Sequence, residues 1–246
     1  MFEWLKPKSK ISNFDKQLLS SNLVGAKTLD ELNNKERLIT EVRGIELKEN
    51  PINGNLDYQH LKEIHKHLFK DIYAWAGNDR YEMGIRGDFR KGDTYFTQGN
   101  NLPTVAQVLF KALKDENNFK NLSKENFIKS TASFMNGLNT LHPFREGNGR
   151  TQRIFIEQLA SRAGYKLDLT QVSSYSMIQA SIHGHRGNLK GFEIILKESI
   201  LSKAKKIDKD IFTLKNYKPN IKEDENQIQK ERAAKKEKMQ DRGMGR

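Results

Sequence analysis

Between Phe127 and Leu141 a series of residues, apolar except for Thr131, recurs at intervals of four, three, four and three positions. This spacing places them on one face of an α-helix. Ser123 precedes the stretch and is a residue type that commonly caps helices. A second stretch with an apolar face begins at Gly147 and stops before Gly164, and glycine often ends a helix. The sequence therefore predicts two amphipathic helices joined by a short loop.

Apolar residues at helical spacing occur along most of the remaining chain and predict five further helices, in the ranges 29–47, 56–69, 103–113, 170–184 and 188–203. Asp57 stands at the expected N-cap of the second of these. Residues 80–99 differ, because glycines interrupt a series of aromatic residues there, which favours a small hairpin. The expected fold class is mainly α, a helical bundle with a small β-hairpin flap.

We expect three parts, an N-terminal arm (1–28), a helical domain (29–203) and a basic tail (204–246). From Lys203 onward the chain carries 14 Lys and Arg and 8 Asp and Glu, half of its net charge of +12. The tail is too poor in apolar residues to form a core, so we expect a solvated helix or a disordered segment there. Binding of nucleic acid or of a partner protein by this tail is the alternative.

Composition excludes several classes of protein. The chain has no cysteine, which excludes disulfides, zinc–thiolate sites and thiol catalysis and fits a reducing cytosol. It contains no apolar run of about 18 residues and no apolar signal segment near Met1, so we expect a cytoplasmic protein without a membrane span. The positive charge favours acidic partners such as nucleotides, nucleic acid or an acidic protein, although distributed solvated lysines would give the same value.

The loop after Leu141 and the start of the helix that follows it have the sequence HPFREGNGRTQR, from His142 to Arg153. Its Gly-Asn-Gly sequence, residues 147–149, can turn several backbone N–H groups into one concave nest at the start of a helix, where the helix dipole adds positive potential. Arg150 and Arg153 are three residues apart and lie on one face of the first turn. Two guanidinium groups beside such a nest are typical of a polyphosphate site.

Two further residues of the loop suggest which chemistry a bound polyphosphate would undergo. Glu146 would repel phosphates, unless a Mg²⁺ ion takes oxygen ligands from this carboxylate and from the substrate. His142 has a near-neutral pKa and suits a general base for a hydroxyl nucleophile. Taken singly, each is an ordinary turn, surface or core residue, whereas the whole string at the start of an apolar-faced helix is far more specific.

The string matches the Fic family motif, His-Pro-Phe-x-Asp/Glu-Gly-Asn-Gly-Arg-x-x-Arg, at every defined position. Residues 56–77 also resemble the family's first core helices, and residues 90–96 resemble its flap. The resemblance covers roughly residues 30–200 and implies a protein adenylyltransferase, an enzyme that moves AMP from ATP to a protein hydroxyl.

The resemblance implies a role for each matching residue. His142 would deprotonate the target hydroxyl, and Glu146 would hold Mg²⁺ between the α- and β-phosphates. Residues Gly147, Asn148 and Gly149 would form the anion hole. Arg150 would contact the β-phosphate and Arg153 the γ-phosphate. The flap would add the target backbone as a strand through Lys91, Gly92 and Asp93.

Many Fic proteins carry an inhibitory helix with the pattern Ser/Thr-x-x-x-Glu-Gly/Asn. Neither Glu49-Asn50 nor Glu225-Asn226 has Ser or Thr four residues earlier. In this respect the chain resembles the class I, toxin-type members, whose inhibitor is a separate small antitoxin that would supply a glutamate to Arg153. Their targets are topoisomerases, which makes DNA gyrase or topoisomerase IV the expected target protein, in the chain's own cell or in one to which it is delivered.

Two alternative functions remain open. One is transfer of UMP, phosphocholine or phosphate, and the other is a non-catalytic module that binds nucleotide or nucleic acid. Elsewhere, His60, His65 and His67 give poor metal-ligand geometry on a helix, so we favour ordinary helix-face residues there. Contact of His183 and His185 with the adenine remains a hypothesis from the resemblance.

Overall fold

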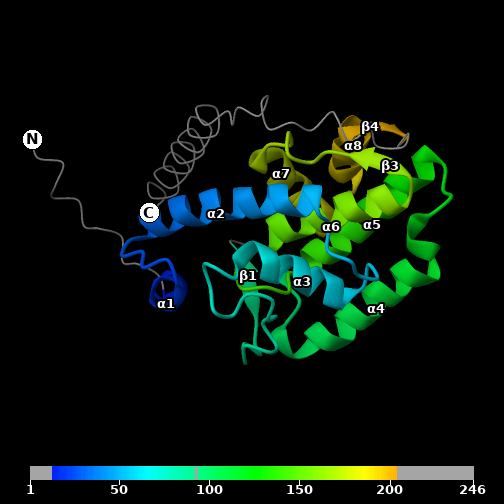
Figure 1. The fold of residues 1–246 in the computed structure, drawn as a ribbon. Helices are drawn as coiled ribbons and strands as arrows, with labels where there is room; N and C mark the ends of the chain where they lie inside the picture. The colour runs from blue at the N-terminus through cyan, green and yellow to red at the C-terminus, as the bar shows by residue number, and fades with distance from the viewer. Residues whose placement is uncertain (1–12, 92–93, 204–246) are drawn as a thin grey trace, which may run out of the picture. The chain divides into compact units, whose positions relative to one another are not determined.

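The computed structural model describes residues 13–91 and 94–203 (Figure 1). Residues 1–12, the flap residues Gly92 and Asp93, and the basic tail at 204–246 lie outside the described residues. The chain divides into two units, residues 1–204 and 205–246, of which only the first is described below. No helix in the described ranges is both long enough and apolar enough to cross a membrane.

The described residues are mainly helical, which confirms the expected fold class. The α-helices are α1 (Asn13–Ser21), α2 (Leu29–Glu49), α3 (Tyr58–Phe69), α4 (Leu102–Asp115), α5 (Lys124–Leu141), α6 (Asn148–Arg162), α7 (Ser174–His185) and α8 (Lys190–Ser199). The strands are β1 (Phe89–Lys91), β2 (Thr94–Phe96), β3 (Tyr165–Leu167) and β4 (Ile200–Lys203), and two short 3₁₀ turns flank α4, η2 (Gly99–Asn101) and η3 (Asn117–Phe119).

Side-chain caps fix where four of the helices begin. Thr28, Asp57, Ser123 and Ser173 each accept a hydrogen bond from the backbone N–H three residues further on. Each cap satisfies one of the N–H groups that the first turn of a helix leaves without a partner. Two of these starts, at Asp57 and Ser123, are the ones that the sequence predicted.

Four strands form two separate antiparallel pairs. β1 and β2 make the expected flap, in the register Phe89 to Phe96 and Lys91 to Thr94. β3 and β4 make a second pair that the sequence did not predict, because a short apolar run after a helix has the same pattern whether it continues the helix or forms a strand. The helix expected to extend to residue 203 therefore ends at Ser199.

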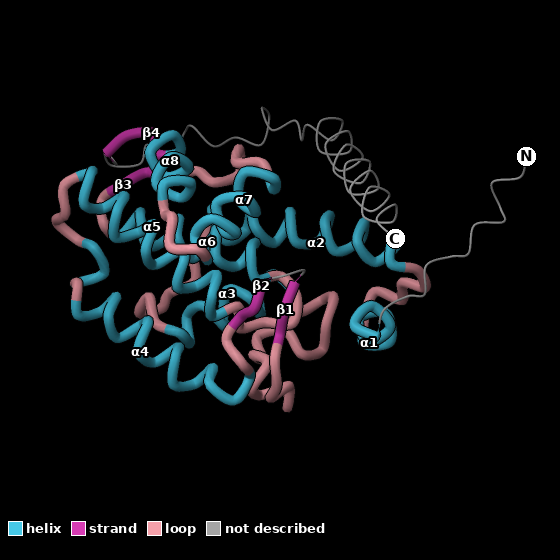
Figure 2. The backbone as a smooth tube through the Cα atoms, turned by 180° about the vertical axis from the view of Figure 1, so that it is seen from behind, coloured by secondary structure: helices cyan, strands magenta, loops and turns pink. Residues whose placement is uncertain are grey.

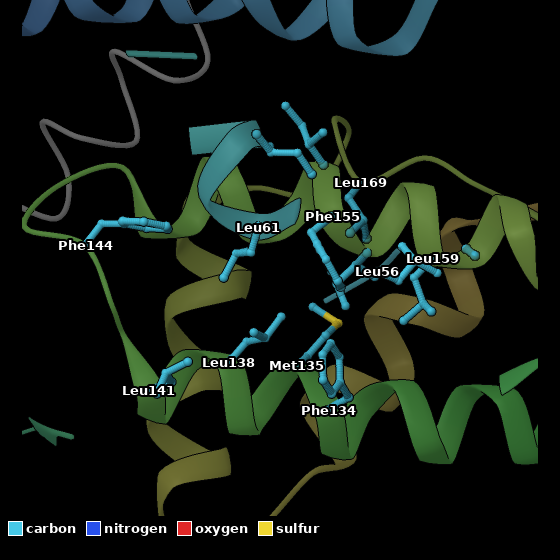
Figure 3. Packing of buried hydrophobic residues seen from close by; sticks show 14 of the residues in the cluster. Leu56, Leu61, Phe134, Met135, Leu138, Leu141, Phe144, Phe155, Leu159 and Leu169 are labelled. Atoms are coloured by element: carbon cyan, nitrogen blue, oxygen red, sulfur yellow. The ribbon is translucent and has the colours of Figure 1, made fainter. Parts of the chain in front are cut away.

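Helices α3, α5 and α6 surround the central core, as seen from opposite sides in Figures 1 and 2. Figure 3 shows Met135 and Leu138 of α5 facing Phe155 of α6, with Leu61 of α3 beside them. Leu61, Leu138 and Phe155 are fully buried. The Phe155 ring meets the Phe110 ring of α4 edge-on, with 5.7 Å between the ring centroids. This packing fixes the two helices that flank the 142–147 loop.

Truncation of Phe155 should destabilise the domain, because it removes a large side chain from a close-packed core. We expect Phe155→Ala to lower the free energy of unfolding in urea by about 3–5 kcal/mol. The matched control is Val108→Ala on α4, whose side chain is 65% exposed and which should change stability by less than about 0.5 kcal/mol. Equal effects of the two substitutions would contradict this description of the core.

Candidate active site

The loop of residues 142–147 begins where α5 ends. His142 adopts the left-handed conformation, with φ 43° and ψ 59°, and its N–H donates to the carbonyl of Leu138. Its imidazole stacks on the Phe96 ring of the flap, with 3.8 Å between centroids, and lies 5.9 Å from the Phe89 ring. The flap therefore covers one face of the histidine that the sequence analysis identified as the base.

The electrostatic setting of His142 keeps its imidazole neutral. Burial lowers the pKa of His142 to about 3, and the charges of Lys91 and Arg80 act in the same direction. The backbone of Asn139, one turn back in α5, favours the protonated form and opposes part of the shift. A neutral imidazole is the form that can accept a proton.

Gly147 begins α6 in a conformation that only glycine tolerates here. Its φ is +82°, and a Cβ atom would lie 2.2 Å from Cζ of Phe69. At Gly149, by contrast, a Cβ would meet no atom within 4 Å, so the backbone at this position faces open space. The N–H groups of residues 148–150 belong to the first helical turn, and none of them donates to another described residue. These N–H groups are available to an anion.

The side chain of Asn148 stabilises the loop through hydrogen bonds to its backbone. Its side chain is buried, its Oδ1 accepts from the Phe144 N–H at 2.9 Å, and its Nδ2 donates to the Phe144 carbonyl at 2.7 Å. The side chain is therefore occupied by the loop itself, and the backbone N–H is the part of Asn148 that remains for a ligand.

Glu146 points toward the flap and toward α6. One carboxylate oxygen accepts from the Gly147 N–H at 2.9 Å and lies 3.6 Å from Nη2 of Arg150. The other oxygen lies 3.9 Å from Nζ of Lys91, so the structure brings this flap residue to the loop. No cluster of three His, Cys, Asp or Glu side chains suited to a metal occurs in the described residues. A lone carboxylate fits Mg²⁺, which takes its other ligands from phosphates and water.

The two motif arginines have different surroundings. Arg150 forms an ion pair with Glu36 of α2, donates to Oγ1 of Thr40 at 3.2 Å and lies over the Phe69 ring. The second carboxylate oxygen of Glu36 accepts from the Tyr73 hydroxyl at 2.5 Å. Glu36 is buried. Its part in the site could not be predicted from the sequence, because its position in α2 gives no sign that it faces α6.

Arg153, in contrast, makes no hydrogen bond or ion pair with the residues that the structure describes. Burial lowers its pKa, and the nearby charge of Arg150 adds to this effect, while Glu157 opposes it. A partly buried cation without a close counter-ion favours a negative charge beside it, so an anionic ligand would be stabilised at this position.

Arg80 was also missed, and it holds the start of the loop. Its side chain is fully buried and donates to the carbonyls of Leu141, His142 and Thr97. Burial lowers the pKa of Arg80 to about 10. Because Thr97 follows β2, this one guanidinium connects the flap to the backbone of His142.

The three histidines of α3 have separate partners and do not converge on one point. His60 accepts from the Leu56 N–H, His67 pairs with Glu46, and His65 bonds to the 142–147 loop. His183 and His185 lie exposed in the last turn of α7, and no described hydrogen bond or ring contact joins them to that loop.

The start of α6 carries N–H groups without an acceptor and an unpaired arginine, and a neutral histidine stands at the end of α5 just before it. In a helical domain, such an arrangement is typical of proteins that bind phosphate groups. The Fic/DOC family pattern matches residues 55–160. The chain is 36% identical over 179 residues to protein adenylyltransferase VbhT of Bartonella schoenbuchensis, covering 73% of this chain and 36% of that protein. It is 35% identical over 161 residues to probable protein adenylyltransferase y4lH of Sinorhizobium fredii, covering 65% and 80% respectively.

The fold is also similar to that of a solved structure. The BepC protein of Bartonella tribocorum, a VirB-translocated effector with bound AMPPNP, superposes with a TM-score of 0.67 at 26% identity, covering 75% of this chain and 92% of that one. The chain belongs to the Fic/DOC family. It spans about a third of the length of VbhT and most of the length of y4lH.

Stability should depend on pH through the buried histidines. The pKa of His142 falls from 6.5 to about 3 on folding, so the unfolded chain binds the extra proton and stability is lost as pH drops below 6.5. We expect the free energy of unfolding of wild type, relative to His142→Asn, to fall by about 2 kcal/mol between pH 7 and pH 5. Asn tolerates the left-handed backbone. Urea titrations at both pH values test this, and a pH-independent difference would show that the pKa is not depressed.

Proposed function

We propose that this chain is a protein adenylyltransferase that transfers AMP from ATP to a hydroxyl side chain of a target protein. The observation that carries the proposal is that one segment of twelve residues holds a neutral, flap-covered His142, a helix start with free N–H groups and an unpaired Arg153. Family membership, relatives named as adenylyltransferases and a structural neighbour with bound AMPPNP support it.

In the proposed reaction, His142 accepts the proton of the target Ser, Thr or Tyr hydroxyl through its unprotonated ring nitrogen. The target oxygen forms a bond to the α-phosphorus, and the bond between that phosphorus and the oxygen bridging to the β-phosphate breaks. Pyrophosphate leaves with the electron pair, and AMP remains on the target. A buried neutral imidazole is in the protonation state that this step requires.

The start of α6 would bind the phosphates. The N–H groups of Asn148 and Gly149 have no acceptor among the described residues and would donate to the α-phosphate oxygens, where negative charge develops. Arg153 would contact the γ-phosphate, and Arg150, already oriented by Glu36, the β-phosphate. Glu146 would hold a Mg²⁺ ion, which when bound supplies neutralisation of the phosphate charge.

The flap would position the target. We propose that the backbone of Lys91, Gly92 and Asp93 adds the target segment as a strand, with β1 and β2 as the supporting hairpin. Lys91 is described, and its side chain is 66% exposed near Glu146, whereas its two neighbours lie outside the described residues. We expect a cytoplasmic target, with DNA gyrase or topoisomerase IV as the first candidates.

The transfer reaction can be tested with radiolabelled ATP, Mg²⁺ and bacterial lysate. We expect a protein band labelled from α-³²P-ATP and not from γ-³²P-ATP. In His142→Ala the labelling rate should fall by about 10²–10⁴-fold, because the general base is lost. Label from γ-³²P-ATP would indicate phosphate transfer instead. Equal labelling by wild type and His142→Ala would refute the role given to this residue.

We further propose that inhibition comes from a separate antitoxin chain that places a glutamate against Arg153. The support is that Arg153 has no acceptor in the described part of the chain, and that the carboxylate of Glu36 pairs with Arg150 instead. The purified chain should therefore label its target without any activating substitution. If wild type is inactive and Glu36→Gln raises labelling at least tenfold, the inhibitory carboxylate is internal and the antitoxin proposal fails.

A further inference from the structure

His65, in the middle of α3, is fully buried and lies against the 142–147 loop. Its Nδ1 accepts a hydrogen bond from the Gly77 N–H at 2.9 Å, and its Nε2 lies 3.1 Å from the carbonyl oxygen of Glu146. Since Nδ1 is an acceptor, it carries no hydrogen, and the single N–H of the neutral ring is at Nε2. Gly77 therefore fixes the tautomer that lets His65 donate to Glu146.

The ring of His65 makes a second contact with the same loop. It stacks on Phe144 with 3.8 Å between the centroids and 13° between the planes. Phe69 and Trp75 also stack on it, at 4.7 and 5.9 Å. The imidazole is thus held in place by aromatic rings, and its N–H points at one carbonyl.

The bond to the Glu146 carbonyl determines the direction of the next N–H group. In a trans peptide the C=O and the following N–H are coplanar and point in opposite directions. Because His65 holds the C=O of Glu146, the N–H of Gly147 must point away from α3, and there it holds the Glu146 carboxylate at 2.9 Å. One imidazole on α3 therefore orients both the first donor of the nest and the carboxylate.

We propose that His65 is a positioning residue of the nucleotide site, which acts through its Nε2–H bond to the Glu146 carbonyl. It touches no reacting atom, and it sets the orientation of the Glu146 carboxylate and of the Gly147 N–H. The inference rests on the proposed function in so far as that function makes the Glu146 carboxylate a ligand of Mg²⁺ in the nucleotide complex. Substitution of a residue that orients a metal-binding group commonly lowers metal affinity or activity by about 10- to 100-fold.

Two substitutions separate the two hydrogen bonds. The side-chain amide of Gln extends to the position of Nε2, so His65→Gln keeps a donor for Glu146. The side-chain amide of Asn ends at the position of Nδ1, so His65→Asn keeps an acceptor for Gly77 and has no donor for Glu146. Both variants lose the ring and its stacking, so the comparison sets the bond to Glu146, which only His65→Gln keeps, against the bond to Gly77, which only His65→Asn keeps.

The readout is the dissociation constant of a fluorescent ADP analogue for the full chain, with Mg²⁺ and with EDTA, beside the thermal midpoint of each variant. We expect His65→Asn to bind the Mg²⁺ complex about 10- to 100-fold more weakly than His65→Gln, with a smaller difference in EDTA. If His65→Asn does not fold, His65→Phe, which keeps the stacking and lacks both polar atoms, replaces it. Equal affinities of the donor-containing and donor-free variants would overturn the proposal.

A parallel labelling assay with α-³²P-ATP distinguishes this inference from the proposed function. If wild type binds the Mg²⁺ complex and the variants differ as expected, but no protein is labelled, His65 retains its positioning role and AMP transfer is wrong. If wild type labels a target and the variants bind alike, AMP transfer stands and the role of His65 is wrong.

Discussion

The backbone at Gly147 is the constraint on which the site depends. Here the chain leaves the loop and enters α6 with φ at +82°, directly against the ring of Phe69. No side chain fits between the glycine and that ring, so α3 can approach the loop closely enough for His65 to reach the Glu146 carbonyl. The close contact between α3 and the start of α6 is what turns a helix N-terminus into an oriented nest of donors.

Around this contact, three separate segments determine the charges at the site. Glu36 of α2 compensates Arg150, Arg80 holds the backbone of His142, and Lys91 of the flap approaches Glu146. Arg153 is left as a partly buried cation with no close counter-ion among the described residues. This unequal distribution favours an anion at Arg153, while burial, helped by the charges of Lys91 and Arg80, lowers the pKa of His142 and keeps it neutral. Both conditions suit attack on a polyphosphate by a hydroxyl group.

Much of the fold could be predicted from the sequence, because helical spacing and capping residues are local signals. The starts at Asp57 and Ser123, the flap hairpin and the order of the helices are examples. The strand at 200–203 could not be predicted, since its partner lies more than thirty residues earlier, at 165–167. Pairing over such a separation depends on how α6 and α8 pack, and local pattern contains no information about it.

For the site, the sequence alone determined which residues are candidates to bind a nucleotide, because His142, Glu146, the Gly-Asn-Gly nest and both arginines lie within twelve consecutive positions. The tertiary structure decided what state those residues adopt. Glu36, His65 and Arg80 come from other segments, and each acts through a buried contact with the loop or the start of α6. The physical reason is that local chain geometry sets which groups are neighbours, whereas burial and counter-ions, which set pKa and orientation, depend on contacts across the fold.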